Sequence, residues 1–337
     1  MDRRNFLKIG TGGVVGAMVP QLLLKCSANT TVLSGWVPNH ESTKLFIRRN
    51  ARPYLSQQTP SAFEGSGQDK VVLLYKYLEQ AIGEIIPHNQ LIGDCVGQAY
   101  ALAVDILSST QIHHGRAAEK WIAKASTEAA YAGSRFEIGY EVYNNSGLLS
   151  GDGSLGVYCA EFLRDYGVLV RQKYGEHDLT RYNAMLARSW GKNGVPDELE
   201  PIAKQHPVRS FALVRSYTEC RDAIANGYPI VFCSSVGFGK CRRHNRNGRD
   251  SMGFLEPCGQ WYHAMSGIAS DDTTRPGILI QNSWGPTWVK GPTRHGQPAG
   301  SFWVDAHVID KMCSQGDSFA ISNFLGFPAQ EINYDLF

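Results

Sequence analysis

Two residues far apart in the sequence could together perform nucleophilic chemistry, the cysteine Cys95 and the histidine His263. A thiol is a strong nucleophile only as the thiolate, and the N-terminus of a helix is one place that favours this form. Gly93 permits a tight turn, and Asp94 has the residue type of an N-cap, which predicts that Cys95 lies in the first turn of a helix. The Asp94 carboxylate would by itself raise the thiol pKa, so a cationic partner such as histidine is needed.

His263 belongs to "WYHAMSGIASDD" and is followed by "ILIQNSWGPTW", which contains Asn282. Both residues lie at the edges of predicted strands that the turn "DDTTRPG" joins. The sequence therefore predicts that His263 and Asn282 lie side by side.

The elements that must position these residues change in type along the chain. Apolar residues at helical spacing predict an amphipathic helix over 66–86, and the residues from Cys95 to about Leu107 are apolar on almost every side, as in a central, buried helix. Further helices are expected at 115–132 and 157–166. After about residue 206 the segments "SFALVRS", "PIVFCSSVG", "HAMSGIAS", "GILIQNSW" and "GSFWVDA" have the composition of short strands.

Helices first and strands second predict an α+β protein of two lobes, a helical lobe over about 66–205 and a β-rich lobe over about 206–337. Residues 29–65 are rich in Pro, Ser, Thr, Asn and Gln, and we expect an irregular N-terminal extension there. No repeat or low-complexity tract is present.

The composition is that of an ordinary globular protein, with 43% apolar and 19% charged residues in a chain of 337. The formal charge is +2, but residues 1–28 carry a net +3, so the rest has a net −1. Nothing in that balance indicates a nucleic acid partner.

Residues 1–28 have the pattern of an export signal, with a charged start, an uncharged stretch over 9–24 and small residues near Ala28. "RRNFLK" resembles the twin-arginine signal, which implies transport of the folded protein by the twin-arginine translocase to a periplasmic or secreted location. Lys25 disfavours the alternative of lipid attachment at Cys26. We expect no membrane span in the mature chain.

Besides Cys26, seven cysteines are present: Cys95, Cys159, Cys220, Cys233, Cys241, Cys258 and Cys313. Some could form disulfides outside the cytoplasm, but the odd number leaves at least one unpaired. Cys95 is the candidate for the free thiol.

A cysteine on a buried helix, then "HAM.GI..DD", then "NSWG..W", resembles the papain-like cysteine peptidase family over roughly residues 66–330. The resemblance implies that Cys95 is the nucleophile, His263 its base, and Asn282 the residue that orients the imidazole. Trp284 would cover the bond between His263 and Asn282, and Gln90 with the backbone N–H of Cys95 would stabilise the oxyanion.

The resemblance extends to "SGDGSLGVYCAEFLRDYGV" (150–168), which is similar to the family's glycine-rich substrate-binding segment. Gly151 and Gly153 are the matching positions, next to which the backbone of an extended substrate would pair. The family requires no metal and no organic cofactor.

The sequence also departs from the family. "LIGDCV" stands where the family has "CGSCW", and Gln90 lies five residues before the cysteine instead of six, so Asn89 is the alternative oxyanion residue. His263 and Asn282 follow Cys95 by 168 and 187 residues, more than the ~130–150 expected, which indicates insertions at 170–206 and 238–260.

Two other sites are conceivable. "GDGSLG" formally matches a dinucleotide-binding fingerprint, but no buried strand precedes it and no βαβ series follows. Cys241, His244, Cys258 and His263 could bind zinc, although their spacing fits no common finger, and a disulfide between Cys241 and Cys258 is an equal alternative. The sequence thus predicts a cysteine peptidase acting on peptides or proteins through a thioester. The alternative is an inactive papain-fold scaffolding protein of the cell envelope.

Overall fold

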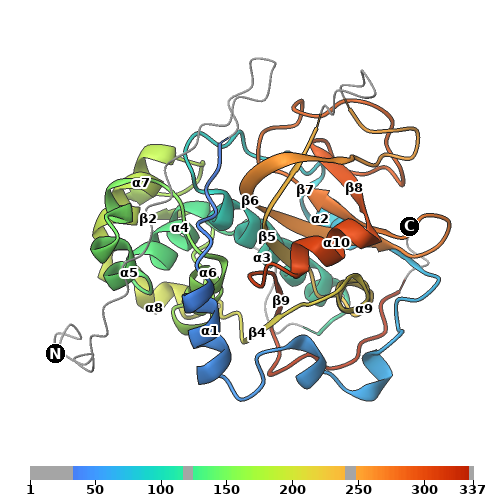
Figure 1. Ribbon diagram of the computed structural model, residues 1–337. Helices are drawn as coiled ribbons and strands as arrows, with labels where there is room; N and C mark the ends of the chain where they lie inside the picture. The colour runs from blue at the N-terminus through green and yellow to red at the C-terminus, as the bar shows by residue number, and fades with distance from the viewer. Residues whose placement is uncertain (1–32, 117–123, 240–247, 334–337) are drawn as a thin grey trace.

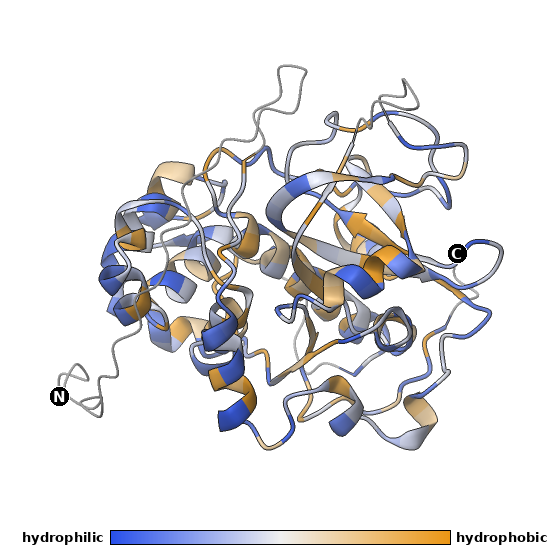
Figure 2. Cartoon of the chain, viewed as in Figure 1, coloured by the Kyte–Doolittle hydropathy of each residue, from blue (hydrophilic) through white to orange (hydrophobic). Residues whose placement is uncertain are grey.

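The computed structural model describes residues 33–116, 124–239 and 248–333, which form two lobes (Figure 1). Helices make up most of one lobe, and an antiparallel sheet is the centre of the other, which confirms the predicted α+β class. Apolar residues gather on the strands and on the inner sides of the helices (Figure 2). The fold thus buries a large apolar core that runs through both lobes, with a small second cluster around Ile92 and Tyr131.

The predicted export signal at 1–28, including Cys26, lies outside the described residues. Within the described ranges, no helix combines the length and the apolar character needed to cross a membrane.

The helix α3 (Cys95–His113) packs against helices of one lobe and strands of the other and is buried on almost every side, as its sequence predicts. It continues past the predicted end near Leu107, because no helix breaker occurs before Gly115. The hydroxyls of Ser109 and Thr110, which would be unfavourable in an apolar setting, donate to the carbonyl of Ile106 at 3.1 and 2.7 Å.

The helix predicted at 157–166 is confirmed as α6. The one predicted at 115–132 is confirmed only over 127–132 and is wrong at the described residues before that. There the helix begins only at Thr127, because Ser126 accepts a hydrogen bond from the N–H of Ala129 as N-cap and Ala125 forms a bridge with Val170. The helical lobe contains, in chain order, α4 (Thr127–Arg135), α5 (Tyr140–Asn145), the 3₁₀ turn η4 (Leu148–Ser150), α6 (Gly156–Asp165), β2 (Lys173–Tyr174), β3 (His177–Asp178), α7 (Ala184–Asn193), η5 (Asp197–Leu199) and α8 (Glu200–Ala203).

The other lobe is built on an antiparallel sheet in the order β4-β9-β5-β6-β7-β8, with β1 paired to β6. All five strand segments predicted between 210 and 306 are confirmed. The β6–β7 register pairs Ser266 with Gln281, so His263 and Asn282 lie just beyond the paired residues at one end. The elements are β1 (Val71–Val72), β4 (Ser210–Leu213), α9 (Tyr217–Ala225), β5 (Ile230–Phe238), β6 (Pro257–Asp271), β7 (Gly277–Gln281), β8 (Ser301–Asp305), α10 (Ala306–Cys313) and β9 (Phe319–Ser322).

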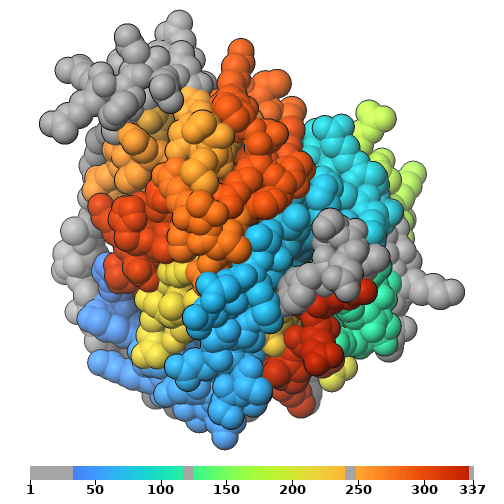
Figure 3. Space-filling view, turned by 90° about the vertical axis from the view of Figure 1, so that its right-hand side faces the viewer, coloured from blue at the N-terminus to red at the C-terminus, as the bar shows by residue number. Residues whose placement is uncertain are grey.

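The helix predicted over 66–86 is wrong in its first half. Only α2 (Tyr75–Ile82) is helical, and β1 pairs with the end of β6 instead. The N–H groups of Gly65 and Gly67 donate to the carboxylate of Asp222 at 2.8 and 3.0 Å, which holds the chain against α9. In Figure 3 this blue segment crosses the outer face of the sheet lobe, so residues assigned to the helical lobe in fact extend the other one.

The N-terminal extension predicted as irregular over 29–65 contains the helix α1 (His40–Arg49) and two 3₁₀ turns, η2 (Leu55–Gln57) and η3 (Ser61–Phe63). The side chain of Asn39 caps α1 by accepting the N–H of Ser42 at 3.0 Å. Phe46 is the main apolar anchor, because its ring packs against Phe211 and Phe319 at centroid distances of 5.1 and 5.5 Å. Ile47 also packs against the core, but the polar composition of the rest of the segment concealed this helix in the sequence.

We predict that Gly133→Ala lowers the free energy of unfolding by about 1–3 kcal/mol, because the added methyl group would overlap the ring of Phe162 where α4 packs on α6. Urea denaturation followed by circular dichroism measures the change. Adding Phe162→Leu removes ring atoms from the contact, so the double variant should lose less than the two single losses together. Wild-type stability of Gly133→Ala would contradict this packing.

Candidate active site

Cys95 is the first residue of α3, and Asp94 occupies the N-cap position as predicted. The Asp94 side chain makes no capping hydrogen bond. Its carboxylate instead accepts from the hydroxyl of Tyr182 at 2.7 Å and from the amide of Gln98 at 3.3 Å. Burial raises the pKa of Asp94 to about 7, against these two hydrogen bonds.

His263 and Asn282 lie together, with 2.8 Å between His263 Nε2 and Asn282 Oδ1. Asn282 Oδ1 also accepts the N–H of Ser283 at 2.7 Å, so it is the carbonyl oxygen, and Nε2 must carry the proton. Nδ1 is then the basic nitrogen, and no described group forms a hydrogen bond with it. The ring of Trp284 lies 4.5 Å from the imidazole and shields it.

The sulfur of Cys95 lies next to this pair without a hydrogen bond to the ring. Sγ accepts the N–H of Ala264, the residue after His263, at 3.3 Å. Burial raises the pKa of the Cys95 thiol to about 12, and the charge of Asp94 adds to this. Burial also lowers the pKa of His263 to about 4, so both groups are neutral at pH 7 in this closed state.

The thiol is fully buried, and the segment Ser34–Val37, which we call the strap, lies directly over it. Gly35 passes so close that a β-carbon at this position would lie 2.9 Å from Cys95 Sγ. Only a glycine fits here. The strap is therefore part of the seal over the thiol, and any reagent or substrate must displace it.

Backbone hydrogen bonds hold the strap to both lobes, between which it runs in Figure 1. The N–H groups of Gly35 and Trp36 donate to the carbonyl of Tyr262 at 3.2 and 3.0 Å. On the helical side, the N–H of Ser154 donates to the carbonyl of Gly35 at 2.8 Å. The N–H of Val37 donates to the carbonyl of Ser154 at 3.0 Å. The strap thus pairs in the manner of an added strand.

Of the two residues considered for the oxyanion site, Gln90 is buried and Asn89 is exposed. The hydroxyl of Ser283 donates to Gln90 Oε1 at 2.8 Å, and Gln90 Nε2 donates to the carbonyl of Ile92 at 2.7 Å. These bonds fix the carboxamide and leave its second N–H available. Asn89 is exposed and forms a bridge with Trp284.

The predicted substrate-binding glycines lie in one loop that Arg135 organises. Its guanidinium is buried and donates to the carbonyls of Gly151 at 2.8 Å and of Gly153. Gly153 packs against the strap with φ of +108°. The backbone groups that pair with the strap belong to Ser154, one residue further on.

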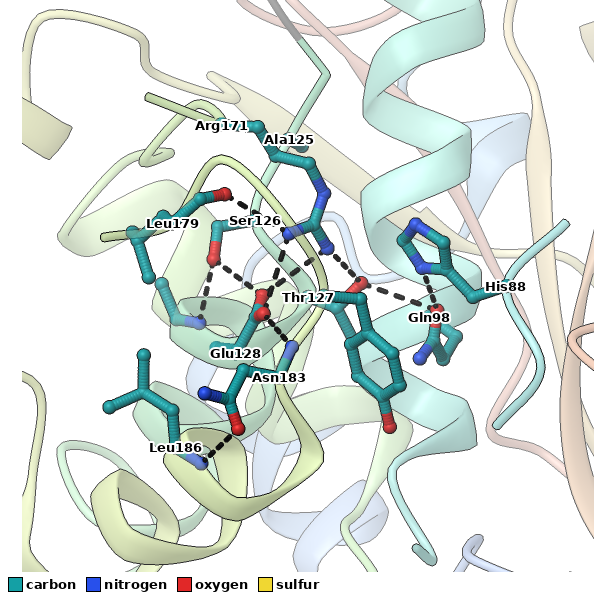
Figure 4. A network of polar contacts seen from close by, with 12 residues as sticks. His88, Gln98, Ala125, Ser126, Thr127, Glu128, Arg171, Leu179, Asn183 and Leu186 are labelled. Carbon is teal, nitrogen blue, oxygen red and sulfur yellow. Dashed lines mark hydrogen bonds and ion pairs between the residues drawn. The ribbon is translucent and has the colours of Figure 1, made fainter. Parts of the chain in front are cut away.

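The insertion predicted at 170–206 supports the start of α3 through a polar network (Figure 4). Arg171 pairs with the buried Glu128 at 3.2 Å and donates to Thr127 Oγ1 at 3.3 Å, and Thr127 donates to Gln98 Oε1 at 3.3 Å. His88 Nδ1 lies 2.9 Å from the same Gln98 oxygen. The segment 170–206 is thus tied to the start of α3 as well as to α4.

Sequence reasoning missed Arg135, Ser154 and Tyr182. Ser154 lies beside the predicted glycines, and its backbone, which carries no sequence signal, makes the contact. Arg135 and Tyr182 are single polar residues whose partners are distant in sequence. Nothing in the sequence marks them.

The alternative sites find no support. Cys241 and His244 lie outside the described residues, and the described ranges hold no group of three or more His, Cys, Asp or Glu residues arranged to bind a metal. The segment 151–156 leads into α6 from a 3₁₀ turn and not from a parallel strand, so it lacks the context of a dinucleotide site.

A comparison with solved structures finds xylellain, a cysteine protease from Xylella fastidiosa, at a TM-score of 0.52 and 17% identity, over 86% of this chain and 91% of that one. The fold of this chain is papain-like. A second papain-like structure, procathepsin B S9 from Trypanosoma congolense, has a TM-score of 0.50 and 10% identity, over 88% of this chain and 87% of that one. No family model and no curated protein matches the sequence. The likeness confirms the predicted papain-like architecture of two lobes.

A partly open cavity of about 60 Å³ lies where the two lobes of the papain-like fold meet, along α3. Its lining includes His88, Asp105 and Asn282. Asp105 is buried and accepts the N–H of Ala125 at 2.7 Å. Burial raises the pKa of Asp105 to about 8, so the carboxyl is protonated in the folded protein at neutral pH.

We predict that Gly35→Ala speeds alkylation of Cys95 by iodoacetamide about 10- to 100-fold, because the β-carbon collides with the sulfur and the Gly93 carbonyl and displaces the strap. Peptide mapping by mass spectrometry measures the rate at Cys95. Cys159, Cys220, Cys233 and Cys313 are buried and serve as internal controls. An unchanged rate at Cys95 would show that the strap does not limit access.

The raised pKa of Asp105 implies that the free energy of unfolding of the wild-type protein falls as the pH rises from about 4 to 8. We predict that Asp105→Asn removes part of this fall. The folded pKa of about 8 exceeds the reference value of 3.8, so the stabilising contribution of this carboxyl is complete at low pH and disappears as the pH rises through 8. The asparagine carbonyl still accepts the Ala125 N–H but does not ionise. Urea denaturation at about pH 5, 7 and 9 should show the variant gaining on wild type with rising pH. A constant difference would exclude this titration.

Proposed function

We propose that this protein is a cysteine peptidase that hydrolyses peptide bonds through a thioester once the strap has left the cleft. The observation that supports it best is the pairing of His263 Nε2 with Asn282 Oδ1 beside the buried sulfur of Cys95, which leaves Nδ1 as an unbound base. A papain-like fold supports the same activity.

In the first step, the Sγ–H proton of Cys95 passes to His263 Nδ1 as Sγ attacks the carbonyl carbon of the substrate. Displacing the strap admits water, which removes the desolvation that now keeps thiol and imidazole neutral. The Asn282 carbonyl stabilises the imidazolium through the Nε2–H, and Trp284 shields that bond from water.

The oxyanion that forms would accept the N–H of Cys95, in the first turn of α3, and the second N–H of Gln90 Nε2. The C–N bond then breaks, and the imidazolium gives its proton to the leaving amine. A water molecule, activated by Nδ1, hydrolyses the thioester and restores the Cys95 thiol.

The second candidate is a papain-fold binding protein without turnover. The observation that favours it is the sealed, neutral thiol, which forms no hydrogen bond with the imidazole. A thiol-reactive peptidyl inhibitor separates the two candidates. Covalent labelling of Cys95 in the Gly35→Ala variant that disappears with His263→Ala supports the peptidase, and inertness supports the binding protein.

We predict that Cys95→Ala abolishes peptide hydrolysis and that Asn282→Ala lowers kcat/KM by about 10- to 100-fold, the effect of one lost hydrogen bond to a charged group. Hydrolysis of a fluorogenic peptide library in the Gly35→Ala background measures both. Asn89→Ala is the matched control, because Asn89 is exposed and should leave kcat unchanged. Full activity of Cys95→Ala would refute the mechanism.

A further inference from the structure

One side chain of the strap occupies a buried position beside the cleft. Trp36 is 4% exposed, and its indole Nε1 donates to Asp317 Oδ2 at 2.7 Å. Its ring is stacked near that of Tyr262 at a centroid distance of 6.3 Å. We call this position, formed by Tyr262, Asp317 and the first turn of α6, the indole site.

Asp317 is built into the indole site by groups other than Trp36. The N–H groups of Gly156 and Val157, at the start of α6, donate to its two oxygens at 2.9 and 2.8 Å. Asp317 is 3% exposed and adjoins the buried thiol of Cys233, since both would contact a β-carbon added at Gly156. Burial raises the pKa of Asp317 to about 7 against these hydrogen bonds, so the group is mostly a carboxylate only above that pH. The bonds fix it in place, with Oδ2 turned toward the indole.

A substrate that replaces the strap meets the same partners. The carbonyl of Tyr262 and the N–H and carbonyl of Ser154 are the backbone groups that the strap uses. Any extended peptide that pairs with them brings one side chain to the indole site, next to the residue that lies over Cys95. The strap thus shows the dimensions and the polarity of a side-chain site.

We propose that Asp317 determines the substrate preference of the cleft, by selecting peptides with a bulky side chain that carries an N–H donor, tryptophan foremost, at the position that Trp36 fills. This rests on the proposed peptidase function and adds the class of substrate to it. An apolar site alone would accept phenylalanine or leucine equally well. With phenylalanine or leucine in the site, the buried carboxylate of Asp317 would keep its two backbone donors but lose the third, the indole N–H. A site built to form a hydrogen bond rejects analogues that lack the donor.

The first experiment compares two peptides that differ only in the N–H group. One carries tryptophan at this position and the other benzothienylalanine, a near-isostere with sulfur in place of N–H. We expect kcat/KM in the Gly35→Ala variant to be about 10- to 100-fold higher for the tryptophan peptide. The strap competes equally with both peptides, so the ratio does not depend on how often the cleft opens. Equal values would overturn the proposal.

The second experiment measures binding without turnover. In full-length protein with Cys95→Ala and Trp36→Ala, calorimetry should give a dissociation constant about 10- to 100-fold lower for N-acetyl-Gly-Trp-Val-amide than for its benzothienylalanine analogue. Preferential binding of the tryptophan peptide, together with no hydrolysis by the Gly35→Ala variant, would contradict the proposed function but support the role of Asp317. Hydrolysis of both peptides without a preference would support the proposed function and contradict the role of Asp317.

Asp317→Asn tests the residue itself. An amide has one acceptor oxygen and cannot serve both backbone N–H groups and the ligand, so we expect the ratio between the two peptides to fall to within about threefold. Ser318→Ala is the matched control, because this neighbouring buried hydroxyl has no described hydrogen-bond partner and its loss should leave the ratio intact. A ratio unchanged in Asp317→Asn would overturn the assignment.

Discussion

The arrangement of the candidate site depends on the burial of α3. A helix that is apolar on nearly every side must be covered on every side, and only a position between two lobes provides this. Its N-terminus then lies where the lobes meet, and the end of the β6–β7 pair lies beside it. One hydrophobic requirement thus brings Cys95 to His263 and Asn282, 168 and 187 residues later in the chain.

The strap changes the electrostatics of that arrangement. Burial favours the neutral form of an acid and of a base alike, so it raises the pKa of Cys95 and lowers that of His263. Together these shifts oppose the thiolate–imidazolium pair in the closed state. The same segment that fills the cleft therefore also holds the two groups uncharged.

Polar contacts from the segment 170–206 support the start of α3. Tyr182 donates to Asp94, and the Arg171–Glu128 pair is linked through Thr127 to Gln98. Breaking any of these hydrogen bonds would leave a buried charge or dipole without a partner, which costs free energy. The network therefore holds its side chains rigidly in place. The segment 170–206 is thus a structural part of the site.

The sequence by itself determined the fold class, the central helix with Cys95 at its start, five strands of the sheet, and the neighbouring positions of His263 and Asn282. These follow from local patterns, namely hydrophobic periodicity, caps and turns, which act over a few residues. Tertiary structure decided what local patterns do not contain. Val71 and Val72 became a strand because β6 offered an edge, α1 formed because Phe46 found Phe211 and Phe319, and Gln90 turned inward because Ser283 donates to it. The strap lies over Cys95 for the same reason: its hydrogen bonds go to Ser154 and Tyr262, more than a hundred residues away, and only the folded chain brings those groups within reach.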